Sequence, residues 1–196
     1  LMKWRCTMSN QSDKASFMKA VTILVDTREQ VNEHITQAFQ QMGVMIENKK
    51  LDYGDYSFMV GDKDFSRSCV IERKADIDEL YGNVTADRER IEKELDTISR
   101  NAVQCVLLLE NCGGWAYLKN FALTDEQMQK QGRKVKNIGA TVYAALQSWR
   151  CGNRYDFQVE FIPTRNLTAA KILEIFYYYY HNYKRIVAPR KDDNHV

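Results

Sequence analysis

The segment Cys69-Val70-Ile71-Glu72-Arg73-Lys74 joins a short apolar run directly to three charged residues. A run of this kind predicts a buried strand. Because residues i and i+2 of a strand share a face, Glu72 and Lys74 should project together while Arg73 points away. An unpaired carboxylate is costly inside a buried strand. The segment therefore predicts a strand that carries a charged site on one face.

Two other apolar runs also meet acidic residues. Residues 21–25 (VTILV) predict a strand that continues directly into Asp26-Thr27-Arg28-Glu29. Residues 51–60 predict a turn containing Gly54-Asp55 and then a strand. We expect this strand to pair with residues 69–74 as a hairpin, which brings the two acidic segments toward each other.

Asp26, Asp55 and Glu72 are the carboxylates that such an arrangement brings together. Three converging carboxylates repel one another unless cations lie between them, and oxygen ligands of this kind suit Mg²⁺ or Mn²⁺. A metal held there lowers the pKa of a bound water and neutralises charge on the leaving oxygen of a phosphodiester. Lys74 is expected to orient that water, assist its deprotonation or stabilise the transition-state charge. The residues therefore point to phosphodiester hydrolysis.

The remaining chain alternates strand and helix patterns, which favours an α/β fold with helices on both faces of a sheet. Residues 103–109 form an almost wholly apolar run, typical of a central strand covered on both faces. Residues 111–139 are expected to form a long, mobile excursion. The other predicted elements are strands at 44–46 and 157–162 and helices at 30–42, 85–100, 140–150 and 166–185.

Length and composition indicate one globular domain. The chain has 196 residues, of which 44% are hydrophobic and 28% charged, which argues against disorder. No apolar run is long enough for a membrane helix, and the five scattered cysteines predict reduced thiols rather than disulfides or zinc ligands. We expect an intracellular protein, cytoplasmic in a prokaryote or virus and nuclear in a eukaryote. The expected organisation is a flexible leader at 1–19, a domain at 20–186 and a flexible tail at 187–196.

The acidic segments also carry a family resemblance. Asp26-Thr27-Arg28-Glu29, Gly54-Asp55 and Glu72-Arg73-Lys74, with Asp78 after three more residues, resemble the XPF-family nuclease signature GD-Xn-ERK-XXX-D. The resemblance implies a restriction-endonuclease-like core of the PD-(D/E)XK type, with a central mixed sheet flanked by helices. It also implies cleavage of DNA with Mg²⁺ or Mn²⁺, preferably branched, flapped or forked DNA. Only eleven residues follow Arg185, so we expect no tandem helix-hairpin-helix modules here.

The resemblance assigns roles position by position. It makes Lys74 the catalytic lysine and makes the three carboxylates both catalytic and metal-binding: Asp26, Asp55 and Glu72. It gives supporting roles to four further positions: Arg28, Glu29, Arg73 and Asp78. For Glu29 a metal or a support role is expected, and for Asp78 a role at the metal or as a cap.

Simpler interpretations stay open for several of these residues. Asp26 and Asp55 taken singly suit turn or cap carboxylates. Glu72 and Lys74 could form a plain ion pair on a strand. Glu110 is interpreted as a simple strand-end carboxylate rather than as part of the site.

The charge distribution suggests a second surface. Residues 1–126 carry a net charge of −5 and residues 127–196 one of +7. Within the basic part, Arg133, Lys134 and Lys136 are candidate DNA-phosphate contacts, with a solvated loop as the alternative. The aromatic run Tyr177 to Tyr180 cannot face one core on a helix. We therefore expect this helix and the one at 140–150 to form a homodimer contact, or a heterodimer contact with a related subunit.

The sequence thus predicts a Mg²⁺- or Mn²⁺-dependent DNA endonuclease acting on branched DNA in repair, recombination or replication. A catalytically silent DNA-binding or scaffold subunit of the same fold is the first alternative. Such a copy is expected to have lost Asp55, Glu72 or Lys74, and this chain keeps all three. A restriction-type endonuclease is the second alternative.

Overall fold

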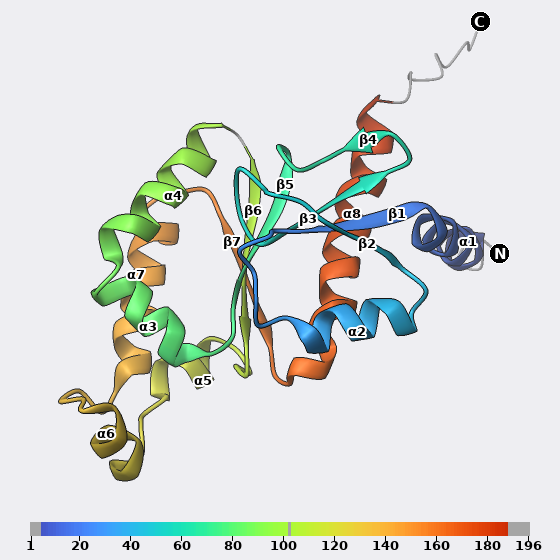
Figure 1. The fold of residues 1–196 in the computed structure, drawn as a ribbon. Coiled ribbons are helices and arrows are strands. Elements are labelled where there is room, and N and C mark those ends of the chain that lie inside the picture. Colours follow the sequence, from blue (N-terminus) through green and yellow to red (C-terminus); the bar gives the residue numbers. More distant parts are fainter. Residues whose placement is uncertain (1–4, 102, 188–196) are drawn as a thin grey trace, which may run out of the picture.

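A computed structural model describes residues 5–101 and 103–187 as one mixed sheet between two layers of helices (Figure 1). The strands are β1 (Val21–Val25), β2 (Met45–Asn48), β3 (Tyr56–Val60), β4 (Lys63–Asp64), β5 (Cys69–Lys74), β6 (Gln104–Glu110) and β7 (Gln158–Ile162). Their order is β2-β1-β3-β5-β6-β7, with β4 beside β3. The β1–β3 and β3–β5 pairs are antiparallel, whereas β1–β2, β5–β6 and β6–β7 are parallel.

Helices cover both faces of this sheet, as predicted (Figure 1). On one face lie α3 (Ile77–Thr85), α4 (Arg88–Arg100), α5 (Trp115–Asn120) and α7 (Ile138–Cys151), and α6 (Asp125–Gln131) extends beyond them. On the other face lie α1 (Arg5–Ala20), α2 (Glu33–Gln41), the short 3-10 helix η1 (Arg165–Leu167) and α8 (Thr168–Val187). No helix within the described residues is long and apolar enough to span a membrane.

The central strand β6 shows why two helical layers are needed. Leu107 and Leu109 belong to the core under α3, α4 and α7, whereas Val106 and Leu108 belong to the core under α2 and α8. Both faces of the strand are therefore buried, as its continuous apolar run predicted. The same alternation in β5 directs Val70 to the first core and Ile71 to the second.

The helix α4 carries one buried stripe, formed by Ile91, Leu95 and Ile98. This confirms the amphipathic pattern predicted for residues 85–100, although the structure divides the region between α3 and α4. The start of α3 is fixed locally, because the Asp76 side chain accepts a hydrogen bond from the Glu79 amide. The sequence did not predict α3, because the charged residues that follow β5 obscure its apolar periodicity.

Two segments differ from the expectations. The leader expected to be flexible at 1–19 contains the helix α1, in which Phe17 is buried and packs edge-on against Phe58 and Tyr177. Residues 1–4 and most of the expected tail, 188–196, lie outside the described residues. The excursion at 111–139 contains α5 and α6, and a Cβ on Gly139 would come within 2.0 Å of the Leu118 carbonyl oxygen. Its order depends on this close packing against α7, which local sequence patterns do not show.

The cysteines within the described residues differ in burial. Cys69, Cys105 and Cys112 are free and buried, whereas Cys151 is free and exposed. Burial raises the pKa of the Cys69 thiol, which favours the unreactive protonated form.

Candidate active site

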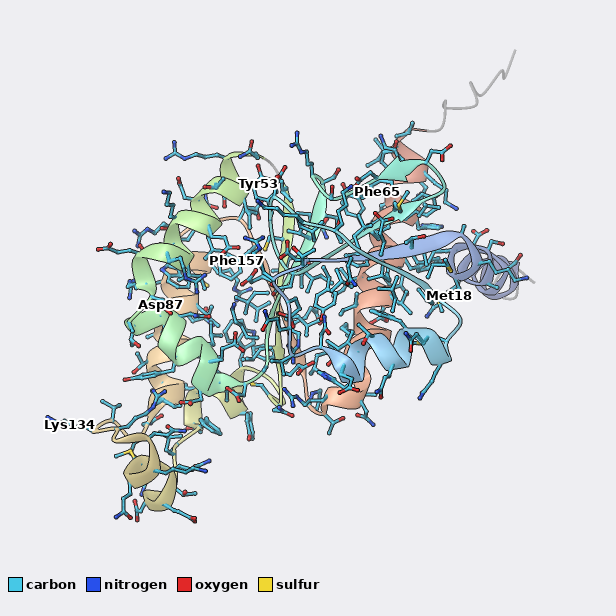
Figure 2. The ribbon with its side chains drawn as sticks, in the orientation of Figure 1. Met18, Tyr53, Phe65, Asp87, Lys134 and Phe157 are labelled. Carbon is cyan, nitrogen blue, oxygen red and sulfur yellow. The ribbon has the colours of Figure 1, made fainter. Side chains whose placement is uncertain are left out.

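Asp55, Glu72 and Lys74 line one pocket of 490 Å³. Asp55 precedes β3, and the antiparallel pairing of β3 with β5 brings it beside the other two residues. The hairpin prediction is therefore confirmed. Tyr53 also lines this pocket and marks its position in Figure 2.

The backbone holds Asp55 in place on β5. Its amide donates to the Ile71 carbonyl oxygen at 2.8 Å, and its Oδ2 accepts from the Arg73 amide at 2.7 Å. Gly54 has φ of +63°, and a Cβ at this position would lie 2.9 Å from the Ile71 oxygen. The glycine of the GD pair thus combines a left-handed backbone with a close approach to β5, and both requirements exclude a larger residue.

Glu72 and Lys74 form the i and i+2 pair that the strand pattern predicted. Lys74 Nζ donates to Glu72 Oε1 at 2.6 Å, and the side chains are only 7% and 9% exposed. Burial alone would lower the pKa of Lys74, but the charges of Glu72 and Asp55 outweigh it and raise the pKa above its ordinary value. Lys74 is therefore a fixed cation in this arrangement.

The surroundings of Asp55, in contrast, disfavour its charged form. Burial and the neighbouring charge of Glu72 raise its pKa well above the ordinary value. Bringing a cation close to both groups removes that repulsion. Asp55 Oδ1 and Glu72 Oε2 accept no hydrogen bond from the described residues, whereas the other oxygen of each carboxylate does.

These two free oxygens fit a hard divalent cation that keeps several water ligands. Asp55 and Glu72 are the residues that would hold it. No three His, Cys, Asp or Glu side chains among residues 5–101 and 103–187 are grouped into a complete metal site. Two carboxylates alone would leave positions on such an ion for water and phosphate oxygens.

Asp26 is not part of this set, so the structure does not support its expected ligand role. Its Oδ1 accepts from the amide and Nε of Arg28 at 2.8 and 2.7 Å, and its Oδ2 accepts from Arg28 Nη2 and the Leu51 amide at 3.0 and 2.7 Å. Burial would raise the pKa of Asp26, but these hydrogen bonds lower it below the ordinary value. With four donors, the carboxylate anchors the loop before β3 instead of facing the pocket.

Arg73 points to the opposite face of β5, as predicted. There its Nη2 donates to Glu110 Oε2 at 2.7 Å and its Nη1 donates to Glu29 Oε1 at 2.8 Å. Glu29 therefore contacts the support network of Arg73 and not the pocket. The Arg73 side chain is only 3% exposed, which makes this ion-pair network an internal one.

Glu110 ends β6 and does not line the pocket, as the sequence indicated, but it is not a simple solvated carboxylate. Glu110 is fully buried and, besides Arg73, contacts Thr168 Oγ1 at 2.6 Å, His34 Nε2 at 2.9 Å and Arg165 Nε at 3.0 Å. Burial would raise its pKa, but hydrogen bonds from Arg73, Thr168 and His34 lower it to about 2. The sequence could have indicated the Arg73 contact. Alternation along β6 places Glu110 on the same face as Leu108, and Leu108 pairs with Arg73 on the neighbouring strand.

Sequence reasoning also missed Glu94, which lines the pocket together with Asp52, Asp55 and Glu72. It lies on α4, and burial together with the charge of Glu72 raises its pKa above the ordinary value. Arg90, Lys93 and Thr97 of the same helix line the pocket as well. The spacing of these four residues is i, i+3, i+4 and i+7, which is the signature of one helix face.

Of the other predicted residues, Arg28 lines the pocket, whereas Asp78, Arg133, Lys134 and Lys136 do not. Asp78 Oδ1 pairs with Arg133 Nη2 at 2.8 Å, and the Arg133 guanidinium lies 4.7 Å from the centre of the Tyr81 ring. Lys136 pairs with Asp125 at 2.8 Å, whereas Lys134 is exposed. Asp78 thus connects α3 to the basic segment, and DNA binding by that segment stays a prediction.

The comparisons with known proteins concern the family and the fold of the chain. A model of the ERCC4 domain matches residues 25–175. Two solved structures of XPF from Aeropyrum pernix, one of them in complex with DNA, are each 16% identical and have TM-scores of 0.53. The matches cover 79% and 82% of this chain but only 59% and 65% of the XPF chains. No curated protein sequence gives a significant match.

The fold is a mixed α/β fold of the restriction-endonuclease-like class, with the central sheet and flanking helices of XPF nuclease domains. The family match covers well over half of the chain. The protein therefore belongs to the ERCC4 domain family, that of XPF-type nuclease domains.

Proposed function

We propose that this protein is an endodeoxyribonuclease that hydrolyses phosphodiester bonds with Mg²⁺ or Mn²⁺. The observation that carries the proposal is the convergence of Asp55, Glu72 and Lys74 in one pocket of an ERCC4 domain. Two carboxylates with free oxygens, next to a buried cation, are suited to bind a divalent ion and a phosphate together.

The residues divide the chemistry between them. A divalent ion, when bound, supplies an acidified water and neutralises charge on the phosphate. Asp55 and Glu72 are the residues that would hold that ion. Lys74, kept protonated by its two acidic neighbours, stabilises the negative charge that develops at phosphorus. A protonated Lys74 cannot accept a proton from water, so among its expected roles charge stabilisation is favoured.

DNA with a branch, flap or fork is the proposed substrate. One of the similar XPF structures is a complex with DNA, which supports the polymer class for this chain. The branched preference rests on the GD-Xn-ERK-XXX-D motif alone.

A panel of labelled linear, flapped, forked and four-way DNAs, incubated with Mg²⁺, Mn²⁺ or EDTA, tests the proposal. We expect cleavage of at least one branched DNA with metal and none with EDTA. The double variant Glu72→Gln/Lys74→Met removes both members of the buried pair, so it should retain the fold but not the activity. Cleavage in EDTA would disprove metal dependence, and cutting of linear DNA at a fixed sequence would favour a restriction-type enzyme. Binding without any cleavage would favour the silent-subunit alternative.

We also propose that α8 contacts a second copy of the chain or a related subunit. Tyr178, Ile186 and Val187 are exposed on this helix, next to a groove of 660 Å³. The helix predicted to share this contact, α7, lies on the opposite face of the sheet (Figure 1). Tyr177 is buried, and Tyr179 and Tyr180 pack against the core. The proposed contact is therefore smaller than the aromatic run suggested.

Sedimentation at micromolar concentration tests the contact between copies. We expect a dimer that dissociates in Tyr178→Asp/Ile186→Asp, since both side chains are exposed in the single chain and tolerate charge there. A wild-type protein that sediments only as a monomer contradicts the homodimer.

A further inference from the structure

The base of the pocket is acidic, and its mouth carries charges of both signs. At the base, Glu72 and Lys74 are buried and Asp55 is half-buried. At the mouth the cations Arg28 and Arg90 have side chains that are 66% and 61% exposed, beside the carboxylates of Asp52 and Glu94, which are 56% and 31% exposed. The base can hold a metal ion, and the mouth offers cations to an anion.

The rim is built mainly by α4. This helix has two adjacent stripes, the apolar one at residues 91, 95 and 98, which packs into the core, and the polar one at residues 90, 93, 94 and 97, which lines the pocket. Packing of the first stripe fixes the direction of the second. The rim cations Arg90 and Lys93 are therefore held over the pocket by the hydrophobic core.

These cations are also available for a ligand. The nearest ion-pair contacts of Arg90, to Asp87 and Glu94, are 4.0 and 3.9 Å long, beyond hydrogen-bond distance. Lys93 forms no ion pair with the described residues. Arg28 uses Nε and Nη2 for Asp26, and its Nη1 donates to no group within the described part of the chain.

The predicted basic segment lies away from the pocket. Arg133 and Lys136 are held in ion pairs of 2.8 Å. Lys134 lies beyond α6, well away from the Tyr53 side of the molecule (Figure 2). Positive sequence charge is therefore abundant in residues 127–196, but the cations at the rim of the pocket are Arg90 and Lys93, which have no short ion pair among the described residues, and Arg28, which is paired with Asp26 through Nε and Nη2 and keeps Nη1 for a ligand.

We propose that Arg28, Arg90 and Lys93 bind the backbone phosphates that flank the scissile phosphodiester, and that they form the DNA-positioning surface of the domain. This inference rests on the proposed nuclease function. Contacts of this kind fix the register of the strand without reading its sequence. They also place the intervening phosphodiester over Asp55, Glu72 and Lys74.

A matched pair of lysine substitutions tests the proposal. Lys93→Gln and Lys134→Gln each remove one positive charge from an exposed side chain. DNA binding is measured by fluorescence anisotropy in EDTA over a range of salt concentrations, so that cleavage does not interfere. We expect Lys93→Gln to weaken binding several-fold and to reduce the slope of log K against log salt by about 0.7–0.9. Lys134→Gln should leave both quantities unchanged.

Two more variants complete the design. Arg90→Gln/Lys93→Gln should reduce the slope by roughly twice as much. Arg100→Gln removes a charge from the same helix away from the pocket and should have no effect. Thermal unfolding, followed by circular dichroism, checks that the folds are intact.

The outcomes separate this inference from the proposed function. If the wild type binds and cleaves DNA but Lys93→Gln and Arg90→Gln/Lys93→Gln bind as it does, the inference is wrong and the nuclease proposal stands. If Lys134→Gln weakens binding as much as Lys93→Gln, the surface includes the basic segment and the proposed assignment is also wrong. If the wild type neither binds nor cleaves any DNA of the panel, both proposals fail.

Discussion

The two faces of β5 stabilise buried charge in different ways. On one face, Glu72 and Lys74 form a short ion pair, yet Glu72 Oε2 and Asp55 Oδ1 accept no hydrogen bond from the described residues. On the other face, Arg73 joins Glu29 and Glu110, and Glu110 has four hydrogen-bonding or ion-pair partners. The first face keeps free ligand atoms, whereas the second uses them within the protein.

This contrast explains how one strand serves both chemistry and stability. A site with unused carboxylate oxygens and like charges in contact is unfavourable for folding, and the pKa of Asp55 is raised accordingly. The ion pairs behind it hold the Arg73 side chain, and the amide of the same residue holds Asp55. The anchoring face thereby supports the geometry of the pocket.

The largest expected effect is on the anchoring face. Glu110→Ala should lower the free energy of unfolding by about 3–5 kcal/mol, because it removes a main partner of the buried Arg73 guanidinium. Urea denaturation at neutral pH measures it. Glu160→Ala on the neighbouring strand β7 is the control, since it removes only a part-exposed contact of 3.7 Å with Lys171 and should cost at most about 1 kcal/mol. Equal losses in the two variants would contradict the anchoring role.

On the pocket face, we expect a substitution to reduce activity strongly and stability less. Glu72→Gln should reduce DNA cleavage at least about a hundred-fold, because it removes a ligand and charge at the reacting phosphate. Its unfolding free energy should fall less than that of Glu110→Ala, since Lys74 keeps Asp55 and Glu79 nearby. Initial cleavage rates and urea denaturation of the same preparations check both statements. A wild-type rate in this variant would remove Glu72 from the chemistry.

Two glycines distinguish close packing from backbone strain. Gly54 and Gly61 both have positive φ, +63° and +57°, but only Gly54 has neighbours where a Cβ would stand. We expect Gly61→Ala to cost about 1 kcal/mol of unfolding free energy, from strain alone. Gly54→Ala should cost up to about 3 kcal/mol and also slow cleavage, because it displaces Asp55 from β5. If both variants lose the same stability and keep activity, close contact at Gly54 does not position the site.

The smallest expected effect is the change in stability at acidic pH. The pKa of Glu110 is lowered from an ordinary 4.5 to about 2 in the folded protein, so its contribution is complete above pH 4.5 and is lost as the pH falls toward 2. The wild-type protein should therefore be more stable than Glu110→Gln at neutral pH, and this difference in stability should decrease as the pH falls. We expect the difference in unfolding free energy to shrink by on the order of 1 kcal/mol between pH 5 and pH 3. Urea denaturation at several pH values measures it, and a constant difference would show that Glu110 is not the titrating group.

Much of the site was accessible from local patterns. The period-2 rule separates Arg73 from Glu72 and Lys74, and the turn at Gly54-Asp55 predicts the hairpin that adds Asp55. The strand–helix alternation gives the α/β fold with helices on both faces of the sheet. These predictions succeed because each depends on residues close in sequence.

Predictions that depend on distant contacts failed or were missed. Asp26 faces Arg28 and the Leu51 amide, because the loop before β3 folds back over the end of β1. Glu110 is a buried anchor only because α2 and α8 bring His34 and Thr168 to it. The helix α1 packs its Phe17 on residues that follow much later in the chain.

The sequence by itself determined which side chains share a strand face and which apolar stripes seek a core. These properties follow from the fixed periods of strands and helices. Only the tertiary structure decided which carboxylates keep free oxygens, which cations stay unpaired and which helix covers the pocket. Those outcomes depend on partners supplied by remote segments, and a charged side chain acts as ligand, anchor or DNA contact according to the partner it meets.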